Sequence, residues 1–303
     1  MTDILLEKGT LWKEIVRRTE HALSAGALLS IPTEYEFIED SGVRFFVRIL
    51  SALKRKADAR KQQEKESVSG KRVNPFLPYE KNLFVADISE THVALLNKFN
   101  VVEHHLLIVT KEFEDQETLL TPDDFDALWA CMAEYNGLGF YNGGEAAGAS
   151  QPHKHLQMVP LPLAPEGPQI PIDSLLLSAD LKGDIGAIPG FPFLHIFARL
   201  GNNIVMSPPD AALRTFELYR DMLQRAGMNR TGGKTIQKQT GPYCLLVTRQ
   251  WMLIVPRSRE FFESVSINSL GFAGALLVWN DRQMEMLKSS GPMTALRSVA
   301  IPV

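Results

Sequence analysis

The chain has 303 residues, 22% of them charged and 45% hydrophobic, which is typical of globular proteins and excludes a long disordered or fibrous chain. The 32 Lys and Arg residues against 35 Asp and Glu residues give a net charge of −3, which disfavours a general electrostatic grip on nucleic acid. No apolar run approaches the roughly 20 residues of a membrane-spanning helix, and the N-terminus lacks a signal-peptide pattern. We therefore expect a cytoplasmic protein with neither a membrane nor a nucleic acid as partner.

Hydrophobic periodicity predicts helices and strands in both halves of the chain. Helices are expected at residues 11–29, 122–137, 211–226 and 280–288, and strands at 35–38, 43–50, 82–86, 92–99, 105–110, 194–200, 243–248 and 252–256. The second helix has the clearest start, because Thr121 can cap its N-terminus and Pro122 suits its first position. Residues 160–192 contain seven prolines and little periodicity, which predicts a long connection between the two parts of the chain.

A basic stretch, residues 54–74, interrupts the predicted strands. It contains eight Lys and Arg residues against three acidic ones. Two interpretations stay open for it: a solvated loop, or a flap that closes over a polyanionic substrate.

Residues 139–160 form the most informative segment for chemistry. Its first part, residues 143–150, is rich in Gly and other small residues, and such loops let backbone N–H groups approach an anion closely. His153, His155 and Gln157 follow with a period of two. On an extended strand these three side chains would project from one face, while the residues between them point into a core.

A metal site and a solvated edge strand compete with a catalytic interpretation of the two histidines. Metal ligation would need a third ligand of cysteine or carboxylate type, which the segment lacks, and Gln is a poor transition-metal ligand. The two cysteines, Cys131 and Cys244, lie far apart in apolar stretches, so we expect them to be buried and predict no metal site. Neutral imidazole is a good nucleophile near pH 7, which favours nucleophilic catalysis on a phosphorus centre.

The same segment resembles the active-site strand of the histidine-triad superfamily, whose hydrolases carry His-x-His-x-His. Gln157 in place of the third histidine is similar to the transferase branch, which holds galactose-1-phosphate uridylyltransferases and ATP adenylyltransferases, also called diadenosine tetraphosphate phosphorylases. Residues 84–92 and 105–111 resemble the nucleoside-binding half of a histidine-triad domain, and residues 267–278 resemble the C-terminal region of the phosphorylases. The uridylyltransferases often carry paired cysteines for a structural metal, which this chain lacks, so the phosphorylases are favoured.

The resemblance implies an α+β fold with a histidine-triad-like antiparallel sheet, flanking helices and a smaller C-terminal α+β portion. We expect a nucleotidyltransferase domain over residues 1–165 and a C-terminal adenylyltransferase domain over residues 190–303.

The resemblance also implies roles for particular residues. His155 would be the nucleophile, with His153 and Gln157 as further catalytic residues. Asp87 and Ile88 would hold the ribose and adenine. Phosphate oxygens and the polyphosphate would be bound by Asn142, Gly148, Ala149, Ser150, Gln151, Gln157 and Lys54, with less certain contacts from Asn268, Ser269 and Leu270. Trp279 stands where the phosphorylases tend to have a lysine, so that contact is in doubt.

The reaction implied is reversible cleavage of diadenosine tetraphosphate by inorganic phosphate, giving ATP and ADP through an adenylylated histidine. No obligatory cofactor is expected, and Mg²⁺ could accompany the nucleotide. Gln157 cannot exchange protons near pH 7, so we expect it to favour phosphate over water as the acceptor. Two alternatives remain: nucleotidyl transfer of another kind, such as uridylyl transfer or ADP formation with sulfate as acceptor, and a catalytically silent dinucleotide-binding sensor.

Overall fold

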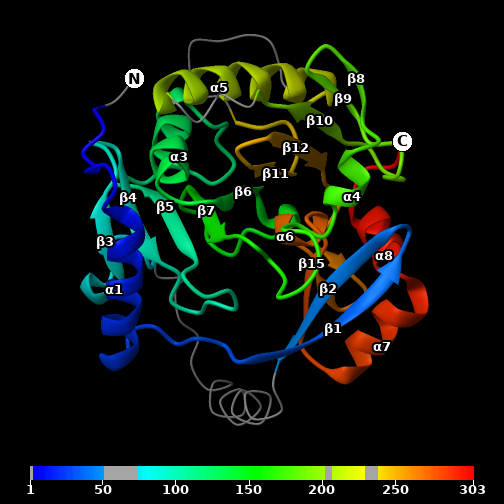
Figure 1. Ribbon diagram of the computed structural model, residues 1–303, viewed down its shortest axis with the longest axis horizontal. Helices are drawn as coiled ribbons and strands as arrows, with labels where there is room; N and C mark the ends of the chain where they lie inside the picture. Colours follow the sequence, from blue (N-terminus) through cyan, green and yellow to red (C-terminus); the bar gives the residue numbers. More distant parts are fainter. Residues whose placement is uncertain (1–2, 51–73, 202–206, 229–237) are drawn as a thin grey trace.

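The computed structural model describes residues 3–50, 74–201, 207–228 and 238–303 (Figure 1). Its helices are α1 (Leu11–Ser24), η1 (Lys81–Leu83), α3 (Pro122–Glu134), η2 (Glu145–Ala147), α4 (Asp173–Leu176), α5 (Pro208–Arg225), α6 (Ser269–Phe272), α7 (Asp281–Ser290) and α8 (Pro292–Val299). Its strands are β1 (Thr33–Asp40), β2 (Val43–Leu50), β3 (Phe84–Asp87), β4 (His92–Leu96), β5 (Leu106–Thr110), β6 (Gly137–Gly143), β7 (His155–Pro160), β8 (Asp180–Lys182), β9 (Ile185–Ala187), β10 (Ile196–Arg199), β11 (Tyr243–Val247), β12 (Trp251–Pro256), β13 (Phe261–Phe262), β14 (Val265–Ser266) and β15 (Ala275–Val278). The predicted basic stretch, apart from Asn74, and with it Lys54, lies outside the described residues.

Ten strands form one antiparallel sheet in the order β3-β4-β5-β7-β6-β11-β12-β10-β9-β8. β6 pairs with β11, so the sheet passes without a break from the first predicted domain into the second. A separate three-stranded sheet, β1-β2-β15, joins the N-terminal hairpin to a strand near the C-terminus through parallel pairing of β2 with β15. The predicted α+β fold with an antiparallel sheet and flanking helices is confirmed.

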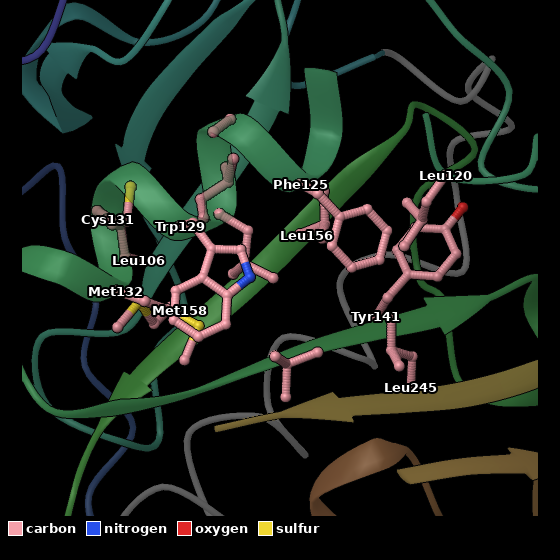
Figure 2. Packing of buried hydrophobic residues seen from close by; sticks show 14 of the residues in the cluster. Leu106, Leu120, Phe125, Trp129, Cys131, Met132, Tyr141, Leu156, Met158 and Leu245 are labelled. Carbon is pink, nitrogen blue, oxygen red and sulfur yellow. The ribbon is translucent and has the colours of Figure 1, made fainter. Parts of the chain in front are cut away.

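Side chains on both faces of the large sheet are buried. Helices α1, α3 and α5 cover one face, and Figure 1 places α7, α8 and the small sheet together on the opposite side of the molecule from α1. Alternate residues of β11 show the two cores, because Leu245 packs toward the first group of helices and Leu246 toward the second. Phe125 and Trp129 of α3 belong to the first core together with Leu156 and Met158 of β7 (Figure 2). Leu156 and Met158 thus lie on the core-facing side of β7, as predicted.

The start of α3 follows the sequence signals closely. Thr121 accepts a hydrogen bond from the Asp124 backbone N–H, and the Asp124 carboxylate accepts one from the Thr121 N–H, which makes a capping box with Pro122 as the first helical residue. The helix ends at Glu134 and not at Gly137, because Gly137 begins β6.

Strand β6 itself was not predicted from the sequence. Its glycines gave no strand-like periodicity, yet Gly139 is needed for packing, since a Cβ there would lie 2.8 Å from the Leu128 side chain of α3. Helix α8 and the short strands β8, β9, β13, β14 and β15 were also not predicted. Within the residues that the structure describes, no helix combines the length and the apolar character needed to cross a membrane.

Candidate active site

Strand β7 lies inside the large sheet, between β5 and β6. His155 is opposite Val109 of β5, and Gln157 is opposite Leu107 of β5 and Phe140 of β6. The predicted period of two therefore holds for His155 and Gln157, whose side chains leave the strand on the face away from Leu156 and Met158.

Lys154 immediately precedes this strand, and its side chain points toward α3, on the opposite face of the sheet. Its side chain is 1% exposed, and its Nζ lies 2.6 Å from Asp124 Oδ2 and 3.0 Å from Glu114 Oε2. Asp124 also accepts a hydrogen bond from His92 Nε2 at 3.1 Å. These charge-assisted contacts hold the Asp124 pKa well below its usual range despite burial, so the carboxylate is ionised and anchors the strand to α3.

The ring of His155 is buried and held in one tautomer. Its Nδ1 lies 2.8 Å from the backbone carbonyl of His153, and because a carbonyl only accepts, Nδ1 must carry the hydrogen. Burial lowers the pKa of His155 to about 4, so the ring is neutral at pH 7 and Nε2 has a free lone pair. The backbone is fixed as well, because the His155 N–H donates to Gln116 Oε1 at 2.9 Å. The arrangement presents a neutral, oriented nitrogen nucleophile.

His153 lies in a different environment from the one predicted. The strand begins only at His155, and His153 instead forms an isolated bridge with Asp115. Its Nε2 lies 2.9 Å from the Thr110 carbonyl, and its Nδ1 accepts a hydrogen bond from Asn74 Nδ2 at 3.0 Å. The side chain is fully buried, and the Phe76 ring packs against both His153 and His155, with centroid distances of 5.5 Å and 5.3 Å. The contact of His153 that orients the His155 ring is made by its backbone carbonyl.

A cavity of about 560 Å³ lies beside β7. Six residues of the predicted site line this cavity, namely Asn142, Gly148, Ser150, Gln157, Asn268 and Leu270. His155 is not among the lining residues, and the ring of Phe76 packs against it with 5.3 Å between ring centroids. Gly148 has a φ of +94°, and a Cβ there would lie 2.8 Å from the Asn268 Cβ, so only Gly allows this loop to approach the C-terminal portion.

Asn142 presents amide hydrogens to this cavity. Its Oδ1 accepts hydrogen bonds from the Ser269 N–H at 3.0 Å and from the Ser269 hydroxyl at 2.7 Å. With the oxygen occupied, the NH₂ group is the part of the amide available for a ligand oxygen. Ser269, predicted as a direct contact, is fully buried, and its hydroxyl and backbone N–H both contact Asn142 Oδ1.

Gln157 is arranged in the same manner by a residue that sequence reasoning gave no role. Its Oε1 lies 2.9 Å from His105 Nε2, which leaves the Gln157 NH₂ group free. His105 is 8% exposed and lines the cavity with Asn97 and Arg48, both also unpredicted. The signal for His105 was present, since it begins a segment that resembles the nucleoside-binding half, but nothing in its spacing linked it to Gln157.

Other predicted residues lie elsewhere. Ala149 and Gln151 line an adjoining cavity of about 510 Å³, which shares Gly148 and Ser150 with the first. The Ile88 side chain is fully buried in the core between α1 and the sheet, so it is not available to a nucleotide.

Asp87 also lies away from the two cavities. It is exposed and pairs with Lys111, with 2.6 Å between Oδ1 and Nζ. Neither Asp87 nor Ile88 lines either cavity. Asn97, in the connection between β4 and β5, lines the first cavity.

Comparisons with known proteins find similarity along most of the chain. A model of the Ap4A phosphorylase N-terminal domain matches residues 1–178, Ap4A being diadenosine tetraphosphate, and a model of the ATP adenylyltransferase C-terminal domain matches residues 189–302. Diadenosine tetraphosphate phosphorylase 2 of Saccharomyces cerevisiae is 29% identical over 272 residues, which cover 80% of this chain and 79% of that protein.

Two crystal structures of yeast Ap4A phosphorylase Apa2 are also similar to this chain. The first has a TM-score of 0.77 and 25% identity and covers 100% of this chain and 96% of that one. The second, a complex with AMP, has a TM-score of 0.75 and 25% identity, with 98% of both chains covered. The domain model alone spans more than half of the sequence, and the chain therefore belongs to the Ap4A phosphorylase family.

Proposed function

We propose that this protein cleaves Ap4A with inorganic phosphate, giving ATP and ADP, by transferring an adenylyl group through His155. The family supports this activity, since the yeast relative is an Ap4A phosphorylase and a structure of it holds AMP. The observation that carries the proposal is the hydrogen bond from His155 Nδ1 to the His153 carbonyl, which leaves Nε2 unprotonated on the strand that also carries Gln157.

In the first step, His155 Nε2 attacks the α-phosphorus of Ap4A. A P–N bond forms, the bond from that phosphorus to the bridging oxygen breaks, and ATP leaves as an anion. The Nδ1 hydrogen stays in its bond to the His153 carbonyl, so the positive charge on the adenylylated ring is stabilised without proton transfer.

In the second step, an oxygen of inorganic phosphate attacks the same phosphorus. The new P–O bond gives ADP, and the P–N electron pair returns to Nε2, which restores the neutral ring. Asn142 and Gln157 donate amide hydrogens to phosphate oxygens in both steps, and Ser150 adds a hydroxyl at the cavity wall. Neither acceptor nor leaving group needs a proton, which suits a site built from amides.

Incubation of the purified protein with Ap4A and phosphate, followed by nucleotide chromatography, tests the proposal. Equal amounts of ATP and ADP are expected. Without phosphate, Ap4A labelled in its α-phosphates should leave an acid-labile label on the protein and release ATP. Binding without turnover would instead identify a nucleotide sensor, and a label that sulfate or a sugar phosphate discharges faster than phosphate would identify a different transferase.

The same assay addresses two further expectations. Mg²⁺ is expected to arrive with the polyphosphate and not on the protein, so activity lost in EDTA should return in proportion to the Mg²⁺–nucleotide complex. A cytoplasmic location stays a prediction, which cell fractionation tests.

A further inference from the structure

The amide of Gln157 can face the cavity in two ways, and only one of them suits a phosphate. With NH₂ toward the cavity, Gln157 donates to a phosphate oxygen. With the carbonyl toward the cavity, two oxygens meet and the contact is repulsive. The two orientations differ only by exchange of oxygen and nitrogen, so a neighbouring group must select one of them.

His105 is that neighbour. Its Nε2 lies 2.9 Å from Gln157 Oε1, and because a carbonyl oxygen only accepts, Nε2 must carry a hydrogen. If the amide turned over, the Nε2–H would meet the NH₂ group and two donors would face each other. An Nε2–H tautomer of His105 therefore holds the Gln157 NH₂ group toward the cavity.

The tautomer of His105 is itself fixed by Asn97. The Asn97 amide nitrogen lies 3.1 Å from His105 Nδ1 and can only donate, so Nδ1 must be unprotonated. The Asn97 oxygen in turn accepts from the backbone N–H of Phe99 at 3.3 Å. A backbone N–H can only donate, so it fixes which groups donate and which accept in the hydrogen bonds that follow.

The backbone keeps these groups in place. Asn97 is the first residue after β4 and His105 the last before β5, and the Asn97 N–H donates to the His105 carbonyl at 2.9 Å. This hydrogen bond joins the two ends of the 97–105 connection. His105 is 8% exposed. Burial also lowers the His105 pKa to about 4, so the ring stays neutral at pH 7 and keeps one donor and one acceptor nitrogen.

We propose that Asn97 and His105 are positioning residues, which act through Gln157 by holding its NH₂ group toward the phosphate that is transferred to His155. The bonds run in one direction, from the Phe99 N–H to the Asn97 amide, then to the His105 ring, then to the Gln157 amide. This proposal rests on the phosphorolysis proposed above and assigns to His105 a role in orientation, with no contact to the reacting phosphorus.

Substitutions that differ in donor position test the proposal. His105→Gln can still place an N–H near the position of Nε2, whereas His105→Leu fills a similar volume without a donor. His105→Leu should lower the single-turnover rate of adenylylation about 10- to 100-fold, comparable to the loss of an oxyanion donor, and His105→Gln should restore most of that rate. Equal rates in the two variants would overturn the proposal.

A double-mutant cycle separates positioning from a structural effect. If His105 acts through Gln157, His105→Leu should cause little further loss in a Gln157→Leu background, whereas additive losses would contradict the proposal. His195→Leu is the matched control, because His195 is another buried neutral histidine, held by Phe193 and Ile188 away from the cavity. It should lower the melting temperature without changing the adenylylation rate.

Two measurements that need no turnover separate this test from the test of the proposed function. Imidazole ¹⁵N shifts, assigned by comparison with His105→Gln, should show an Nε2–H tautomer for His105. AMP should bind more weakly to His105→Leu than to His105→Gln. If the wild type fails to cleave Ap4A but both results hold, phosphorolysis is wrong and the positioning role stands for nucleotide binding. An Nδ1–H tautomer would overturn the positioning role whatever the activity.

Discussion

Two amides on neighbouring strands, Asn142 of β6 and Gln157 of β7, face the cavity, and different kinds of donor hold them. On the β6 side, a hydroxyl and a backbone N–H of Ser269 fix the oxygen of Asn142. On the β7 side, a histidine ring fixes the oxygen of Gln157. The first anchor comes from the C-terminal portion and has no group that titrates near neutral pH. The second comes from the hairpin next to the strand, and its direction depends on one ring being neutral. The two sides thus present the same donor group with different sensitivity to pH and to mutation.

The largest expected effect comes from removing His155, the proposed nucleophile. His155→Ala should lower Ap4A cleavage by a factor on the order of 10⁶, as found when a covalent nucleophile is lost, and no acid-labile label should form. AMP binding should persist because Asn142 and Gln157 remain. His153→Ala is the comparison and should cost less, since the backbone carbonyl that orients His155 is retained. A greater loss in His153→Ala would reassign the nucleophile.

Replacing the β7 amide tests what an amide contributes as such. Gln157→His should lower the rate on the order of 10²-fold, by analogy with oxyanion donors. Since a histidine can transfer protons and activate water, the share of AMP among the products should rise relative to ADP. Quantifying both nucleotides by chromatography with phosphate present measures this ratio. An unchanged ratio would show that the phosphate pocket decides the acceptor.

The pH dependence of adenylylation and of AMP binding should distinguish the β7 side, which depends on neutral histidines, from the Asn142–Ser269 contact on the β6 side. Protonation removes the nucleophilic lone pair of His155, whose pKa is about 4, so the adenylylation rate should hold from pH 8 to about 5 and fall roughly tenfold for each unit below 4. An unperturbed histidine, with a pKa of 6.5, would already lose half of the rate at pH 6.5. Circular dichroism at each pH checks that the protein stays folded. In His155→Ala, AMP binding should also weaken toward pH 4, because His105 has a pKa of about 4.

The smallest expected effect concerns the β6 side. Ser269→Ala removes the hydroxyl that bonds to Asn142, but the Ser269 backbone N–H still fixes the amide direction. The rate should therefore fall only about threefold to tenfold, and stability by about 1 kcal/mol, the usual contribution of one hydrogen bond. Urea denaturation and steady-state kinetics measure the two. Ser298→Ala on α8, which loses a bond to the Ala295 carbonyl, is the control for stability alone.

The sequence was most informative where a local backbone conformation favours one particular type of residue. The Thr121 cap and the alternation of His155, Leu156 and Gln157 could be predicted, because each depends on residues close in the chain. The small-residue loop around Gly148 could also be recognised, but its packing against Asn268 could not. The site also depends on pairs that no local pattern shows. Ser269 was expected to touch substrate, but its hydroxyl is buried against Asn142 on β6.

Other predicted residues make contacts in the structure that their spacing in the sequence does not show. His153 satisfies the period of two in the sequence, but its ring is drawn to the Thr110 carbonyl and to Asn74 before the strand begins. The assignment of Asp87 and Ile88 to the nucleoside relied on likeness alone. The following hairpin, β4–β5, brings Asn97 and His105 to the cavity instead, because its connection ends beside Gln157.

The pairing of β6 with β11 and of β2 with β15 also has a consequence for how the protein is made. A ribosome synthesises β7 well before β11, the strand that extends the sheet beyond β6, because β11 begins 88 residues after the start of β7. Ser269 and β15 come later still. The nascent chain thus carries His155 without the residues that direct Asn142 toward a phosphate until Ser269 has been synthesised, so competence to bind nucleotide should arise only after that point and not gradually.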